Sequence, residues 1–212
     1  MCNRYGLHSP LAVLQDVFEF LNGLELEPRY NVAPGQDIVV VRLDSDGRRE
    51  AVVAHWGMPL AGRPAPVLNA RAETVASGPA FREAVRRGRV LVPANGFYEW
   101  RQEGPARQPY YFEVANRPLF AMAGLVDPET HGVIITTSAN SDIADVHDRM
   151  PVIVPAERYG EWLGEGAAKD PKDLLRRMPK PRLRRRPVDT AVNDARHEGP
   201  DLLKPAVQGR LF

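Results

Sequence analysis

The only cysteine of this 212-residue chain is Cys2. If Met1 is removed, Cys2 carries a free α-amine and a thiol on adjacent carbons. These two groups can add in turn to a single carbonyl carbon and close a five-membered ring. A second interpretation stays open from the position alone, in which Cys2 is a small packing residue at the start of a strand.

Three further groups of polar residues interrupt apolar stretches, namely NARAET at 69–74, PANGFYEW at 93–100 and VHDRMPVIV at 146–154. Glu99 lies between two aromatic residues. Burial there disfavours the ionised carboxylate and suits a proton carrier, whereas strand alternation offers the alternative that Glu99 points to solvent. Asn69 and Arg71 alternate with alanines, so in an extended segment both polar side chains face one way.

His147 is a lone histidine, a type that is commonly a surface residue or a satisfied core residue. Its neighbour Arg149 and the apolar run that follows favour a site instead. No P-loop, zinc or dinucleotide-binding pattern occurs in the sequence, so we expect neither a metal nor a cofactor.

The composition predicts one soluble domain, with 43% hydrophobic and 26% charged residues. The net charge of +1 gives no global basic field, so DNA binding requires a local patch. One cysteine excludes an internal disulfide framework. The sequence shows neither a signal-peptide pattern nor an apolar run of about 18 residues, so we expect a cytoplasmic protein without membrane contact.

The hydrophobic patterns predict an α+β fold, with a mostly antiparallel, barrel-like β-sheet core and flanking short helices. A first helix is expected within Ser9–Gly23, with Ser9 as its N-cap. The Pro- and Arg-rich stretch 169–189 is interpreted as a solvated connecting segment in preference to a nucleic-acid patch. Strands are expected at 37–43, 49–58, 88–100, 110–115, 119–127 and 132–139, and further helices within 73–88 and 155–165.

Nine segments, taken in order, resemble the SRAP domain family (SOS response-associated peptidase), also called abasic-site processing proteins. They are MCNRY, YNVAPGQ, HWGMP, LNARAET, RVLVPANGFYEW, FAMAGLVD, ITTSAN, VHDRMPVIV and VNDARHEGPDLL. The resemblance implies the SRAP fold, as a single domain over residues 1–203, followed by a mobile C-terminal tail over 204–212. It also implies a DNA-repair enzyme of the SOS and DNA damage response that senses abasic sites in single-stranded DNA.

The resemblance further implies a covalent thiazolidine link to DNA through the amine and thiol of Cys2, with associated lyase activity and autocatalytic removal of Met1. It implies an active-site group of Cys2, Asn69, Glu99 and His147. The expected DNA contacts are Arg4, Arg71, Arg149 and Trp56. We expect a monomer that is associated with the nucleoid when bound to DNA.

Two features depart from or add to the family pattern. Asn3 stands where the family usually has glycine. The final QGRLF is similar to the pentapeptide with which bacterial proteins dock on the sliding clamp, through Gln208, Leu211 and Phe212; alternatively, Leu211 and Phe212 pack back on the domain. Two other classes stay open, namely an N-terminal-nucleophile cysteine amidohydrolase and a non-covalent DNA-binding module tethered to the clamp.

Overall fold

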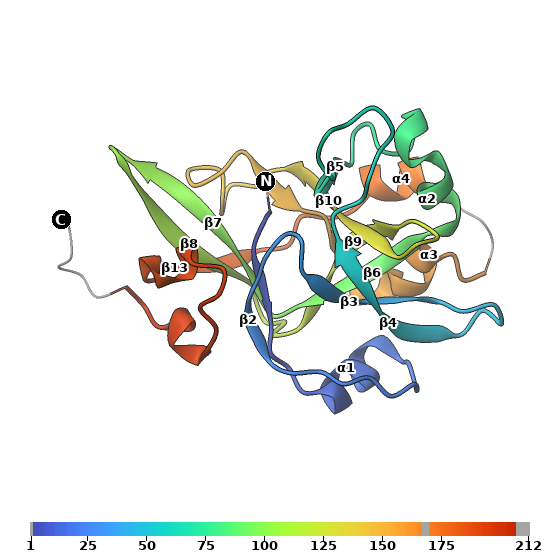
Figure 1. Ribbon diagram of the computed structural model, residues 1–212, viewed down its shortest axis with the longest axis horizontal. Helices are drawn as coiled ribbons and strands as arrows, with labels where there is room; N and C mark the ends of the chain where they lie inside the picture. Colours follow the sequence, from blue (N-terminus) through green and yellow to red (C-terminus); the bar gives the residue numbers. More distant parts are fainter. Residues whose placement is uncertain (1, 167–169, 207–212) are drawn as a thin grey trace.

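The computed structural model describes residues 2–166 and 170–206 (Figure 1). The strands are β1 (Tyr5–Leu7), β2 (Arg29–Val32), β3 (Asp37–Leu43), β4 (Arg49–Trp56), β5 (Asn69–Arg71), β6 (Arg89–Ala94), β7 (Gly96–Glu103), β8 (Ala106–Val114), β9 (Phe120–Val126), β10 (His131–Ser138), β11 (Arg149–Pro151), β12 (Ile153–Val154) and β13 (Leu183–Pro187). The α-helices are α1 (Leu11–Phe18), α2 (Arg82–Arg87), α3 (Tyr159–Leu163) and α4 (Pro171–Arg176). Short 3-10 turns are η1 (Pro79–Phe81), η2 (Ala156–Arg158), η3 (Thr190–Asn193) and η4 (Pro200–Leu203).

A closed ring of strands holds most of the core. β10 pairs with β9, β9 with β6, β6 with β3, β3 with β4, and β4 returns to β10. The β4–β10 contact is the one parallel pairing in this ring, and every residue of β9 is buried. The predicted α+β class with a mostly antiparallel, barrel-like sheet is therefore confirmed.

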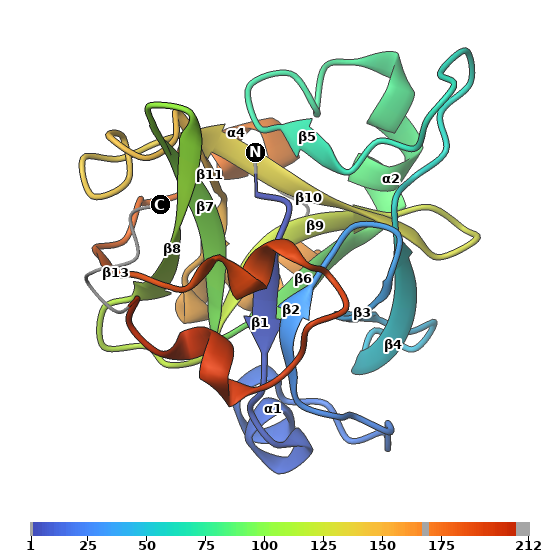
Figure 2. The ribbon, with the colours of Figure 1, turned by 60° about the vertical axis from the view of Figure 1, so that its left-hand side comes forward.

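A second sheet, in the order β13-β8-β7-β1-β2, brings the start of the chain to the ring. Figure 2 shows the N-terminus between the β7–β8 hairpin on one side and β5 and β10 on the other. Within this sheet, Gly96 on β7 leaves room for the Tyr111 side chain of β8, because a Cβ at position 96 would lie 2.3 Å from Cζ of Tyr111. The first residues of the chain are thus placed between the two sheets.

The Pro- and Arg-rich stretch is more ordered than the sequence predicted. Asp170 caps α4 by accepting a hydrogen bond from Lys172 N, and β13 pairs along its whole length with β8. The interpretation as a connecting segment is therefore wrong for residues 183–187. The sequence pattern of this strand was weak, because β13 lies at the edge of the sheet and carries arginines where a central strand would carry apolar residues.

The segment after β13 packs on the outer face of the second sheet. Val188, Val192 and Leu202 form a small hydrophobic cluster with Tyr98 and Tyr111. Residues 207–212 lie outside the described part of the chain, so a domain boundary at residue 203 stays a prediction. Within the described ranges, no helix is long and apolar enough to cross a membrane.

Candidate active site

The β1–β7 pairing places the N-terminal residues beside Glu99. Tyr5 pairs with Phe97, and Tyr98 N donates to the carbonyl of Arg4 at 2.9 Å. The same register, continued, puts Asn3 opposite Glu99. Cys2 is fully buried in the core, which the packing interpretation required.

The thiol of Cys2 is held in its neutral form. Burial raises its pKa far above the usual range, and the nearby Glu99 carboxylate raises it further. A neutral thiol is a weak nucleophile, so this environment does not provide a preformed thiolate.

Glu99 is the buried acid of the site. Only 3% of the residue is exposed, which rules out the solvent-facing alternative. Burial raises the pKa of Glu99 to about 7. A carboxyl group that titrates near neutral pH both takes up and returns protons efficiently.

Strand β10 positions Asn69 and the loop that carries His147. Asn69 on β5 pairs in parallel with Ile134, and Arg149 on β11 pairs with Ser138. The predicted extended conformation at 69–71 is confirmed, with Ala70 buried and Arg71 exposed.

The loop between β10 and β11 is fastened to the segment around β13. Asn140 Nδ2 donates to Pro181 O at 2.8 Å, and Leu183 N donates to Asp142 at 2.9 Å. Asp145, two residues before His147, forms ion pairs with Arg185 on β13 and with Arg101 on β7, the latter at 3.7 Å. The position of His147 therefore depends on contacts distant in sequence.

The His147 ring has a defined tautomer when neutral. Arg149 N donates to its Nδ1 at 2.9 Å, so the ring proton lies on Nε2, which is 4.0 Å from Oε2 of Glu99. Burial lowers the pKa of His147 and favours this neutral ring. An Asp148 oxygen lies 3.1 Å from the same Nδ1 and becomes a partner when the ring is protonated.

Glu99 and His147 open into a hollow of about 330 Å³, which is also lined by Asn3, Trp100, Gln102, Arg107 and Val146. The sequence reasoning did not single out Trp100, Gln102 or Arg107. Hairpin register was the available signal, because Gln102 pairs with Arg107 across the β7–β8 turn. The Trp100 indole is held by Asn193 Oδ1 at 2.7 Å.

The three arginines predicted to bind phosphate differ in the partners that their side chains already have. Arg71 is exposed and has no side-chain partner among the described residues. Arg149 binds Glu73 through two nitrogens at 2.8 and 2.9 Å and also donates to Thr136 O at 2.6 Å. Arg4 donates to Asn31 Oδ1 at 2.7 Å and to Val192 O at 2.8 Å. Only Arg71 is free to bind an anion without exchanging an internal partner.

The family model for SOS response associated peptidase (SRAP) matches residues 1–195. This chain belongs to the SRAP family. It is 33% identical to the abasic site processing protein YoqW of Bacillus subtilis, over 96% of this chain and 99% of that one. It is 29% identical to the abasic site processing protein YedK of Escherichia coli, over 97% of this chain and 100% of that one. A crystal structure of a protein from Bacteroides thetaiotaomicron superposes with a TM-score of 0.78 at 25% identity, covering 97% of this chain and 100% of that one.

Trp56 of this SRAP chain lies in the core, contrary to its predicted role as a DNA contact. It has no exposed surface, its indole donates to Leu68 O at 3.0 Å, and its ring packs 5.7 Å from that of Tyr5. A side chain without exposed surface does not touch DNA. The fold places Trp56 at the buried end of β4, where strand alternation turns it inward.

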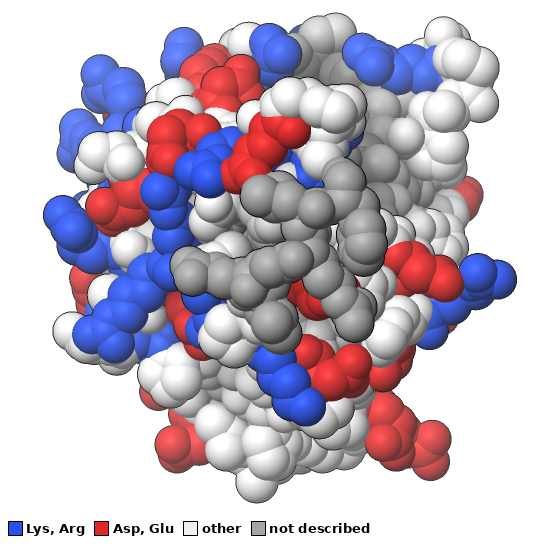
Figure 3. Space-filling model, turned by 90° about the vertical axis from the view of Figure 1, so that its left-hand side faces the viewer, with Lys and Arg blue, Asp and Glu red and all other residues white. Residues whose placement is uncertain are grey.

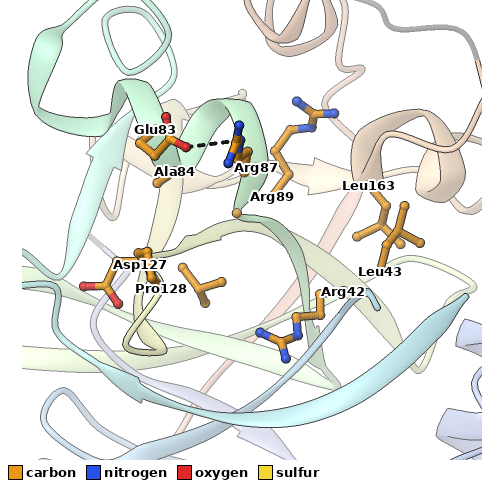
Figure 4. A pocket seen from close by; sticks show the side chains of 11 residues that line it. Arg42, Leu43, Glu83, Ala84, Arg87, Arg89, Asp127, Pro128 and Leu163 are labelled. Atoms are coloured by element: carbon orange, nitrogen blue, oxygen red, sulfur yellow. Dashed lines mark ion pairs between the residues drawn. The ribbon is translucent and has the colours of Figure 1, made fainter. Parts of the chain in front are cut away.

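A second hollow of about 250 Å³ lies at the His131 end of β10, away from Cys2 (Figure 4). Its charged side chains have partners, since Arg87 pairs with Glu83 at 3.2 Å and Arg42 with Glu50 at 2.7 Å. Neither cysteine nor histidine lines it. None of the site residues singled out from the sequence lines this hollow.

Proposed function

We propose that this SRAP chain captures abasic sites in single-stranded DNA by a covalent bond to Cys2, after removal of Met1. The observation that carries the proposal is the placement of the single cysteine, at the start of the chain, beside a buried carboxyl group with a pKa of about 7. The names of YoqW and YedK, abasic site processing proteins, support the same substrate.

The chemistry requires both groups of Cys2. A ring-opened abasic site presents an aldehyde at C1′. The α-amine, whose reference pKa is about 7.7–8.0, is partly neutral at pH 7.5 and attacks C1′. Loss of one water gives an imine, the thiol sulfur then bonds to C1′, and the thiol proton passes to the nitrogen. The product is a thiazolidine, and the net change is the loss of one water.

The neighbours of Cys2 supply proton transfer and orientation. Glu99 accepts a proton from the attacking amine and returns it to the departing hydroxyl. Neutral His147 donates from Nε2 toward the same centre. Asn69 orients the reacting groups with its amide. The neutral thiol is suited to the second step, because it adds to an imine that is already formed.

The same imine also permits strand cleavage. Removal of a C2′ proton from it expels the 3′ phosphate, which is a lyase reaction. We further propose that Met1 leaves by autocatalytic hydrolysis of the Met1–Cys2 peptide bond, which consumes one water and frees the Cys2 amine; the word peptidase in the family name supports such a reaction. Both activities use the groups already placed around Cys2.

The DNA backbone is held by local arginines on a nearly neutral protein. Arg71 takes a phosphate directly, and Arg149 and Arg4 add contacts by exchanging internal partners. The face seen in Figure 3 carries many Lys and Arg side chains interspersed with acids, so the basic character is local and not a continuous field. We propose that the protein acts as a monomer in the DNA damage response, with DNA holding it at the nucleoid.

The amidohydrolase alternative is less well supported. The family match over residues 1–195 favours the abasic-site reaction.

The test is an incubation with a single-stranded oligonucleotide that carries one abasic site, followed by a denaturing gel. The wild-type protein gives a shifted band without borohydride. Cys2→Ser keeps the amine but lacks the sulfur, so its band depends on borohydride; Cys2→Ala behaves likewise. A borohydride-independent band of wild-type strength from Cys2→Ala would remove the proposal.

Docking on the bacterial sliding clamp is a separate proposal. Its residues, Gln208, Leu211 and Phe212, lie outside the described part of the chain. Deletion of residues 208–212 abolishes clamp binding in a pull-down and leaves adduct formation unchanged. Equal clamp binding by the truncated and full-length chains contradicts the docking proposal.

A further inference from the structure

Asn3 is hydrogen-bonded to a residue of the proposed reaction. Asn69 Nδ2 donates to Asn3 Oδ1 at 2.7 Å. The backbone of Asn69 is already fixed by the β5–β10 pairing. The remaining freedom of Asn69 is rotation of its side chain, and the bond to Asn3 sets that rotation.

The carbonyl oxygen of the Asn69 amide is available to accept a hydrogen bond. Its Oδ1 is buried and has no hydrogen-bond partner among the described residues. Buried carbonyl oxygens are almost always satisfied in folded proteins, so an exception next to a reacting group points to a ligand. Asn3 follows Cys2 directly and lines the same hollow as Glu99 and His147.

We propose that Asn3 is a positioning residue that holds the Asn69 amide with its carbonyl oxygen toward the reacting centre. In that orientation Asn69 accepts a hydrogen bond from the hydroxyl that forms on C1′ when the amine of Cys2 adds. The inference rests on the proposed function. A glycine at position 3 would have no side chain to make this contact.

The first experiment is a double-mutant cycle on the rate of adduct formation. Asn3→Gly slows the rate about tenfold, the size expected when one positioned hydrogen bond is lost. In an Asn69→Ala background the same change has no further effect, because Asn3 acts through Asn69. Affinity for an oligonucleotide with a tetrahydrofuran in place of the abasic sugar stays at the wild-type value, since that analogue has no aldehyde. Asn22→Gly is the control, because the Asn22 side chain bonds the backbone of Ala51 and does not line the hollow.

A second variant tests the direction of the amide. Both amides turned together would keep their bond but present the Asn69 NH₂ to the centre. Asn3→Asp excludes this arrangement, because an ionised carboxylate only accepts, and Asn69 must then donate to it. We expect Asn3→Asp to recover most of the rate that Asn3→Gly loses.

Three results overturn the inference. They are an Asn3→Gly rate equal to or above that of wild type, losses that multiply in the Asn69→Ala background, and an Asn3→Asp rate no better than that of Asn3→Gly. Each result counts when the wild-type protein forms the adduct and the variant has the same melting temperature as the wild-type protein. Absence of any wild-type adduct is the distinct result that removes the proposed function as well.

Discussion

The two hollows near the ends of β10 differ in how the fold treats their polar groups. In the hollow of Figure 4, Arg87 and Arg42 each have a carboxylate within ion-pair distance. In the hollow near Cys2, Glu99 is buried with a pKa raised to about 7, and Asn69 Oδ1 has no partner in the described chain. The arginines of the Figure 4 hollow are therefore held in ion pairs, whereas the hollow near Cys2 combines a carboxyl group of raised pKa with a buried amide oxygen beside it. Perturbed carboxyl groups and unpartnered buried oxygens are typical of functional sites, whereas the number of charges is not.

The largest expected effect tests whether Glu99 is the proton carrier. Glu99→Gln keeps the shape but cannot exchange a proton, so we expect adduct formation to slow about a hundredfold. The wild-type rate rises as pH increases through about 7, where Glu99 becomes the carboxylate that accepts the amine proton. Rates between pH 5.5 and 8.5 check this. A variant that keeps the wild-type rate contradicts the role.

The same substitution separates function from stability. The Glu99 pKa lies near 4.5 in a solvated chain and about 7 in the fold, so its contribution to stability is complete below pH 4.5 and is lost as pH rises through 7. The Gln side chain of Glu99→Gln stays neutral, so the variant avoids that loss. The difference in the free energy of unfolding, variant minus wild type, should therefore be larger at pH 8 than at pH 4.5 by on the order of 2 kcal/mol. Urea unfolding at both pH values measures the gain; a pH-independent difference would mean that Glu99 is not perturbed.

A smaller effect compares arginines at the two ends. Arg71→Ala should weaken binding to single-stranded DNA about tenfold and reduce the salt slope by roughly one ion. Arg87→Ala, in the hollow of Figure 4, is the matched control and should leave both quantities unchanged. Fluorescence anisotropy at several salt concentrations gives both numbers. Equal losses of DNA affinity in the two variants would contradict the proposed difference between the two hollows.

The smallest effect concerns the support of His147. Asp145→Asn weakens the pairs with Arg185 and Arg101, and the loosened loop should slow strand cleavage about threefold without changing DNA affinity. Asp173→Asn removes an exposed pair with Arg176 on α4 and serves as control. Cleavage is followed on a denaturing gel. A loss of affinity without a change in cleavage rate would place Asp145 in DNA binding instead.

Much of the sheet could be predicted because its strands are short apolar runs between turn residues. The expected strand at 37–43 coincides with β3. The first helix was predicted at the right place but too long, since α1 spans Leu11–Phe18. Ser9 does not cap it; the Ser9 hydroxyl accepts a hydrogen bond from Asn95, a contact across 86 positions that local patterns do not contain.

The site was predicted as residue types, and its geometry came from pairing over long distances. Glu99 and His147 were singled out, but their 4.0 Å approach depends on β7 and on a loop fastened by Asp145. Trp56 was misplaced because a tryptophan near polar motifs gives no sign of which face it occupies. The Asn3–Asn69 bond was not anticipated, although position 3 already stood out as a departure from the family.

The most direct test of covalent capture by Cys2 is the intact mass of the protein after incubation with an oligonucleotide carrying one abasic site. The account predicts the mass of the protein without Met1, plus the oligonucleotide, minus one water, and it predicts no such species for Cys2→Ala. Protein shown by its mass to lack Met1 that forms no adduct would contradict the account.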